Sequence, residues 1–142
     1  GYVNALKNND IKVDESLIIR IEDTEHYEDS IEQLLKTKSP EAVFAVNELF
    51  AVTAIKVASR LGIKIPEELS IIGFTDGLIS KYSSPSITTV GQDGIKMGAK
   101  AAKMLIERLE AEEIENSVGE IEEHYRTEVI ETELVEREST KS

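Results

Sequence analysis

The chain contains no cysteine and no tryptophan among its 142 residues. Without cysteine it can form no disulfide, no thiolate zinc site and no cysteine nucleophile. Imidazole is also scarce, because only His26 and His124 could supply it, and they lie far apart with no partner motif around them. We therefore interpret both histidines as ordinary surface residues and expect neither a metal nor a cofactor.

Positive charge is the second scarcity. The chain has 16 basic against 28 acidic residues, a formal net charge of -12. That balance repels a phosphate backbone, so this segment by itself is not expected to bind DNA. No apolar run approaches the roughly 20 residues that cross a bilayer, and Gly1–Leu6 lacks the order of a secretory signal. The sequence therefore predicts a cytoplasmic protein with no membrane partner.

What the chain does contain is enough apolar material, 40% of its residues, for one compact core. Residues 17–21, 42–46 and 70–74 are short runs with apolar side chains on both faces, and segments of helical periodicity separate them. Crossover helices make neighbouring strands parallel and must cover the sheet. We predict an α/β fold built as a doubly wound parallel sheet.

Other signals place the remaining elements. We expect the first residues to lie inside a helix, and a helix from Tyr27 to end at Ser39-Pro40. A further helix begins at Asn47 and is closed by Gly62. The other predicted elements are a strand at 87–90, a long helix from Asp93 to Glu113 and an edge strand at 127–136.

Ligands of an open parallel sheet bind beyond the carboxyl ends of its strands. Three polar loops follow predicted strands: Glu22–Thr24, Asn47-Glu48 and Thr75-Asp76. The amide of Asn47 can donate and accept hydrogen bonds, and Asp76 can accept them from hydroxyl groups, which suits a neutral or cationic polar small molecule. Equally, Asn47 can be only a helix cap and Asp76 only a turn residue.

Catalysis would require a nucleophile with its base, paired carboxylates of tuned pKa or a metal cluster. Acidic pairs such as Glu67-Glu68 and Glu112-Glu113 are more simply solvated faces. We therefore do not expect an enzyme.

Several stretches resemble one family closely. These are 40–48, the run 61–74 with its Leu-Gly-Ile-Lys-Ile-Pro-Glu-Glu-Leu-Ser-Ile-Ile-Gly-Phe sequence, 85–92 and the ending 132–139. They are similar to the regulatory domain of the lactose-repressor/galactose-repressor (LacI/GalR) family of bacterial transcription regulators, over nearly the whole chain.

The resemblance implies a periplasmic-binding-protein-like fold of type I, represented mostly by its C-terminal subdomain. Residues 1–91 would form that subdomain, incomplete at its N-terminus. Residues 92–124 would cross over and give a helix to the N-terminal subdomain, and 125–142 would be the return strand and tail. The implied function is effector sensing and homodimer formation, with operator DNA bound only through an N-terminal helix-turn-helix that lies outside this segment.

The resemblance also assigns effector contacts. Asn47 matches an effector-contacting asparagine, Gln92 lies at the crossover that lines the cleft, and Thr75 and Asp76 belong to an effector-contacting loop. The family usually has aspartate at the positions of Glu48 and Thr75. The lost carboxylate at Thr75 weakens the case for a typical sugar, because a carboxylate accepts hydroxyl hydrogen bonds more strongly than threonine does; the expected effector is sugar-like or nucleoside-like. The alternative is a periplasmic sugar-binding protein of an ABC transporter. With half of the cleft outside it, this segment alone is expected to bind effector weakly and to self-associate.

Overall fold

The computed structural model describes residues 1–21, 26–118 and 126–141. Its helices are α1 (Tyr2–Asn8), a 3-10 turn η1 (Glu15–Leu17), α2 (Tyr27–Lys38), α3 (Glu48–Arg60), α4 (Leu78–Tyr82) and α5 (Gly94–Val118). Its strands are β1 (Ala42–Ala45), β2 (Ser70–Phe74), β3 (Thr88–Gly91) and β4 (Glu133–Val135), arranged in the order β1-β2-β3-β4. The first three are parallel and β4 is antiparallel to β3, which confirms the predicted α/β class with a parallel sheet.

Helix α3 forms the centre of the core. The side chain of Asn47 caps its first turn and Gly62, at φ +74°, follows its last residues, as the sequence predicts. Small side chains let α3 approach the sheet closely, because a Cβ on Gly73 of β2 would lie 3.4 Å from the Cβ of Ala51. The buried apolar side chains of this core are Ile31, Leu35, Ala45, Ala51, Ala54, Ile55, Val57, Ala58, Leu69, Ile71 and Ile87.

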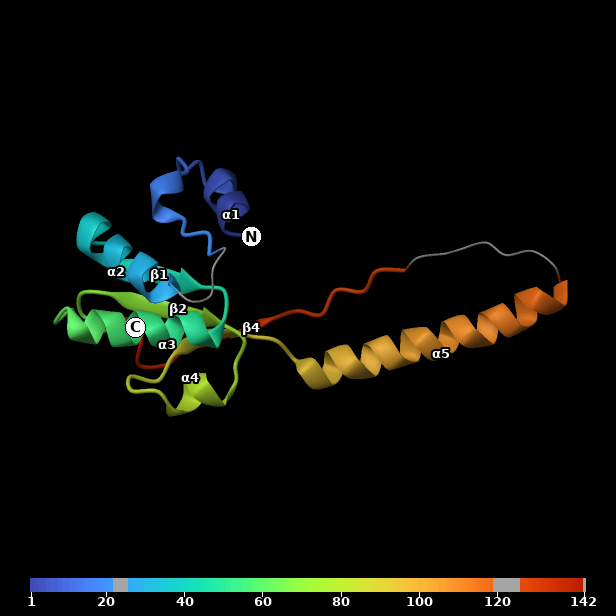
Figure 1. Ribbon diagram of the computed structural model, residues 1–142. Coiled ribbons are helices and arrows are strands. Elements are labelled where there is room, and N and C mark those ends of the chain that lie inside the picture. Colours follow the sequence, from blue (N-terminus) through green and yellow to red (C-terminus); the bar gives the residue numbers. More distant parts are fainter. Residues whose placement is uncertain (22–25, 119–125, 142) are drawn as a thin grey trace.

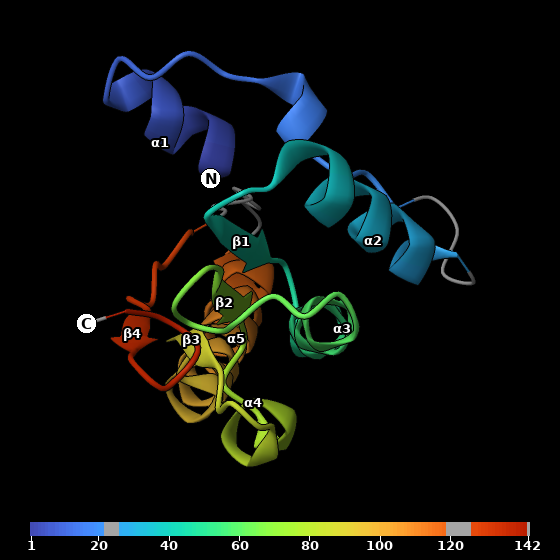
Figure 2. The same ribbon diagram turned by 90° about the vertical axis from the view of Figure 1, so that its left-hand side faces the viewer.

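The two faces of the sheet differ. Helix α3 packs on β1 and β2 and α2 packs on α3, so both helices lie on one side of the strands (Figure 2). Because Gly73 faces α3, Phe74 points to the opposite side, where its ring meets that of Phe44 at a centroid distance of 6.5 Å. Phe44 stays 48% exposed, so this second face is much less covered.

The strand predicted at 17–21 is wrong. The Asp14 carboxylate accepts a hydrogen bond from the Ser16 N–H at 2.9 Å and opens the 3-10 turn Glu15–Leu17. Ile18 is extended and Ile19 packs against the core, so the apolar residues of this segment did indicate contact with the core. No strand of the described chain pairs with this segment, however, and an extended segment without a partner is not a strand.

Helix α5 projects away from the sheet, and the segment after residue 125 returns toward it (Figure 1). The helix predicted from Asp93 to Glu113 is confirmed and extends to Val118. Ion pairs join α5 to the returning segment, with Lys100 Nζ 3.2 Å from Glu128 and Arg126 3.2 Å from Glu107. The edge strand predicted over 127–136 does lie at the sheet edge, but only Glu133–Val135 pairs with β3.

Candidate functional site

The parallel strands end at one edge of the sheet, and polar residues follow each of them. Asn47 comes after β1, Thr75 and Asp76 follow β2, and Gln92 follows β3. The register places Ala45 beside Gly73 and Phe74 beside Val90, so these positions lie along the same edge. The predicted loop Glu22–Thr24 falls at residues 22–25, outside the described residues.

Asn47 has one structural task and one unused group. Its Oδ1 accepts a hydrogen bond from the Phe50 N–H at 2.9 Å, so the capping role that the sequence left open is present. Its Nδ2 amide has no partner among the described residues. Asn47 is half-buried at the sheet edge. Its amide N–H groups remain available as donors to a ligand.

Thr75 holds an uncommon backbone conformation. Its φ is +81°, a value that is rare for β-branched residues because their Cβ crowds the backbone there. Its N–H donates to the Val90 carbonyl at 3.0 Å, which fixes the start of the turn against β3. Strain of this kind costs about 1–3 kcal/mol and concentrates at binding sites. The side chain of Thr75 is exposed beyond the strand end.

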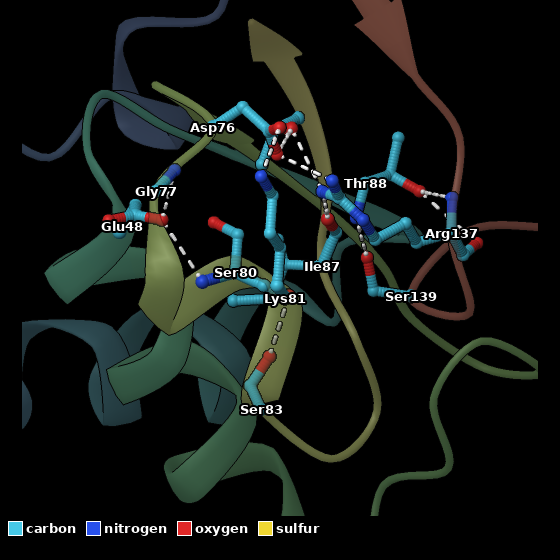
Figure 3. A network of polar contacts seen from close by, with 11 residues as sticks. Glu48, Asp76, Gly77, Ser80, Lys81, Ser83, Ile87, Thr88, Arg137 and Ser139 are labelled. Atoms are coloured by element: carbon cyan, nitrogen blue, oxygen red, sulfur yellow. Dashed lines mark hydrogen bonds and ion pairs between the residues drawn. The ribbon is translucent and has the colours of Figure 1, made fainter.

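Asp76 lies at the centre of a polar network (Figure 3). Its Oδ1 accepts a hydrogen bond from Thr89 Oγ1 at 2.9 Å and pairs with Arg137 Nη2 at 2.6 Å, while Lys81 Nζ lies 3.5 Å from Oδ2. Burial would raise the pKa of this carboxyl, but the hydrogen bonds from Thr89 and Arg137 and the two positive charges outweigh it and hold the pKa below 3.8. Asp76 is therefore ionised and internally compensated.

Glu48 supports the other side of the same turn. One of its carboxylate oxygens accepts hydrogen bonds from the N–H groups of Gly77 at 2.7 Å and Ser80 at 3.0 Å (Figure 3). These are donors at the start of α4, which has no cap from its own side chains. Glu48 thus acts as a capping group for α4 supplied by α3, a role the sequence analysis did not assign.

Gln92 is exposed at the crossover from β3 to α5, and its carbonyl accepts a hydrogen bond from the Gly94 N–H at 3.0 Å. Its side-chain amide has no partner among the described residues. The structure therefore brings Asn47, Thr75 and Gln92 to one edge, with side-chain polar groups that have no partner among the described residues.

Arg137 and Ser139 contribute to this region although the sequence analysis singled out neither as a site residue. Arg137 reaches Asp76 from the segment after β4. Ser139 is fully buried, where its Oγ donates to the Ile71 carbonyl and accepts from the Thr88 N–H. A motif such as Arg-Glu-Ser near the end of a chain carries no spacing signal, so only the resemblance of 132–139 pointed to this segment.

The edge offers polar groups that can form hydrogen bonds. Within 1–21, 26–118 and 126–141 no group of His, Asp and Glu residues is arranged to hold a metal ion. Over the same residues no helix has both the length and the apolar character needed to span a membrane. The Asp76 carboxylate is paired with Arg137 and Lys81, and the Glu48 carboxylate accepts two backbone N–H groups, so neutral amide and hydroxyl groups dominate what the edge offers.

Comparison with known proteins agrees with the fold. A family profile described as a periplasmic binding protein-like domain matches residues 1–140. The HTH-type transcriptional regulator MalR of Clostridium butyricum is 36% identical over 141 residues, which cover 98% of this chain and 39% of that protein.

Two solved structures are also similar. A complex of the transcriptional regulator CelR with cellobiose gives a TM-score of 0.78 at 28% identity, covering 97% of this chain and 40% of that one. A sugar-binding regulator of the LacI family from Escherichia coli, complexed with phosphate, gives 0.77 at 26% identity, covering 97% and 47%. The chain spans less than half the length of each of these relatives.

Proposed function

Because the chain belongs to the LacI family, with its periplasmic binding protein-like domain, we propose that it forms the effector-sensing and dimer-forming part of a cytoplasmic bacterial transcription regulator. The observation that carries this proposal is the convergence of Asn47, Thr75 and Gln92 at the carboxyl edge of three parallel strands. DNA would be bound by a separate helix-turn-helix module, because the net charge of -12 opposes binding here.

The relatives named above are all described as transcriptional regulators. This favours a regulator over the periplasmic sugar-binding protein of a transporter, which shares the fold.

The effector that suits this edge is a neutral polar molecule, sugar-like or nucleoside-like. The Asp76 carboxylate is neutralised by Arg137 and Lys81, so the edge presents little uncompensated charge. Thr75 offers a hydroxyl and Asn47 an amide, which both donate and accept hydrogen bonds. The CelR relative was solved with cellobiose, a ligand of this chemical class.

A matched variant separates the two roles of Asn47. Asn47→Asp keeps the oxygen that caps α3 and removes the free Nδ2 donor, and Asp caps a helix about as well as Asn does. A thermal-shift screen of the full-length protein with sugars such as cellobiose and nucleosides such as adenosine should identify an effector that raises the melting temperature. We expect Asn47→Asp to keep the melting temperature of the free protein and to lose that shift. An unchanged shift in Asn47→Asp would remove Asn47 from the site.

The homodimer is proposed on exposed apolar surface. On α4, Leu78 is 70% and Tyr82 83% exposed, values that are high for large apolar side chains. On α5, an exposed stripe follows helical spacing and comprises Ile95, Ala99, Ala102, Leu105, Ile106 and Leu109. We propose that residues 92–124 pack with the first subdomain of the regulator, and that this chain on its own covers the stripe with a second copy.

Sedimentation over a wide concentration range tests this. The chain should associate, Leu105→Glu should weaken association through α5, and Tyr82→Lys should weaken association through α4. A monomer at every concentration would contradict the proposal. An association that neither variant changes would place the contact elsewhere.

A further inference from the structure

The Arg137 side chain is fixed by three acceptors at once. Its Nη1 donates to the Ile87 carbonyl at 2.8 Å and to Thr89 Oγ1 at 3.1 Å, and its Nη2 pairs with Asp76 at 2.6 Å. The side chains of Arg137 and Asp76 are only 15% and 20% exposed. A pair so sheltered from water is screened weakly, and its planar guanidinium gives it a defined geometry.

The position of this pair in the chain is specific. Strand β3 leads to α5 through Gln92, and β4 leads back from the segment after α5. Strand β3 passes Asp76 closely, because a Cβ on Gly91 would lie 3.4 Å from the Asp76 Cβ. Strand β4 lies next to β3 at the same place, because that Cβ would also lie 3.5 Å from the Glu133 carbonyl oxygen. In the described part of the chain, the end of β3 that leads to α5 and the start of β4 that returns from it are therefore paired beside the Asp76 turn.

The turn Thr75–Gly77 has two anchors of different kinds. Glu48 attaches Gly77 to α3, which belongs to the packed core. Arg137 attaches Asp76 to the segment that follows β4, on the side of the two connections to α5. A change in the direction of the chain between the sheet and α5 would therefore shift the Arg137 anchor and leave the Glu48 anchor in place.

We propose that Arg137, Asp76 and Thr89 form a hinge clamp that sets the Thr75–Gly77 turn relative to β3 and β4, so that the orientation of α5 is transmitted to the effector edge. Arg137 is in this view a positioning residue, and Asp76 is its partner in the clamp. The role of the clamp in effector binding rests on the proposed function. The geometry of the clamp does not, because it is present in the chain without any ligand.

Hydrogen exchange on the ligand-free chain tests the clamp. Arg137→Gln removes the charge and most of the donors, and it should speed amide exchange at Thr75 and Gly77 by about tenfold or more, because it leaves the Asp76 charge sheltered and unpaired. Exchange in α3, which Arg137 does not touch, should change little. Arg20→Gln is the matched control, because it removes another arginine ion pair, with Glu15, that is exposed and distant.

A distance measurement tests the transmission to α5. The chain has no cysteine, so spin labels can be placed at Ser59→Cys on α3 and Ala101→Cys on α5, both exposed positions outside the apolar stripe. Arg137→Gln should widen the distribution of distances between the labels, and Arg20→Gln should not. Arg137→Lys retains the charge but lacks the planar guanidinium. It should give exchange rates in the turn and a width of the distance distribution between those of the parent chain and of Arg137→Gln, so it provides the test if Arg137→Gln folds poorly.

Two results would overturn the clamp: exchange that rises equally in α3 and in the turn, or a label distribution that stays as narrow as in the parent chain. Neither measurement contains a ligand, so such a result would leave the effector screen and the Asn47→Asp comparison intact. Failure of the screen, in turn, would leave the exchange and label data valid for the clamp.

Discussion

Ser139→Ala should be among the most destabilising single-atom deletions in this chain. Ser139 is fully buried, and its Oγ donates to the Ile71 carbonyl at 2.5 Å and accepts from the Thr88 N–H at 2.8 Å. Both partners are backbone groups of residues no more than 1% exposed, so neither can turn to water instead. Leaving one buried group unsatisfied costs about 1–3 kcal/mol, so we expect a loss of about 2–5 kcal/mol in the free energy of unfolding.

Urea unfolding followed by circular dichroism measures this loss as a lower midpoint at an unchanged slope. Ser86→Ala is the control, because its Oγ also bonds a residue of the same terminal segment, Glu138 at 2.9 Å, but at an exposed position. We expect Ser86→Ala to cost less than about 1 kcal/mol. A Ser139→Ala variant as stable as Ser86→Ala would refute the account of Ser139 as a buried bridge between strands.

Three further predictions concern the turn at the effector edge. Thr75→Asn should raise the free energy of unfolding by about 1 kcal/mol in urea titrations, because Asn tolerates positive φ better than Thr does. A free energy of unfolding that does not rise would show that the backbone at Thr75 is not strained. Gly77→Ala should displace the Glu48 carboxylate from α4 and lower the thermal midpoint, whereas Gly94→Ala, with open space around its Cβ, should not. The pKa of Asp76 is lower in the folded chain than in the unfolded chain, so at acidic pH the unfolded chain binds more protons. The stability that this carboxylate contributes is therefore lost as the pH falls through its folded pKa. Asp76→Asn should therefore flatten the fall in stability between about pH 5 and pH 3, and an unchanged slope would contradict the pairing with Arg137.

The parts of the fold that were predictable from sequence are those with strong local signals. The apolar run 70–74 gave β2 with its observed bounds, and Asn47 and Gly62 marked both ends of α3. The strand at 17–21 was wrong because apolar character reports burial, which Ile19 has, and not pairing, which depends on a neighbouring strand.

The candidate site was predictable in its strand ends and not in its internal contacts. Asn47, Thr75, Asp76 and Gln92 do follow parallel strands, since strand polarity determines that edge. The Asp76–Arg137 pair joins residues that no local pattern connects, so the sequence could not show that this carboxylate is already occupied. Their role in binding an effector stays a prediction.

The buried bridge at Ser139 also has a consequence for how the chain folds as it is synthesised. Its Oγ bonds Ile71 across 68 positions. The Ile71 carbonyl of β2 and the Thr88 N–H of β3 therefore lack this partner until Ser139 has been synthesised. At about 5–20 residues per second, a ribosome needs roughly 3–14 s to make that stretch. Once β3 has been made, the nascent sheet holds β1 to β3, but the outer edge of β3 stays unpaired until β4 and Ser139 have been synthesised. An exposed edge of this kind is one that chaperones bind or that pairs with another chain.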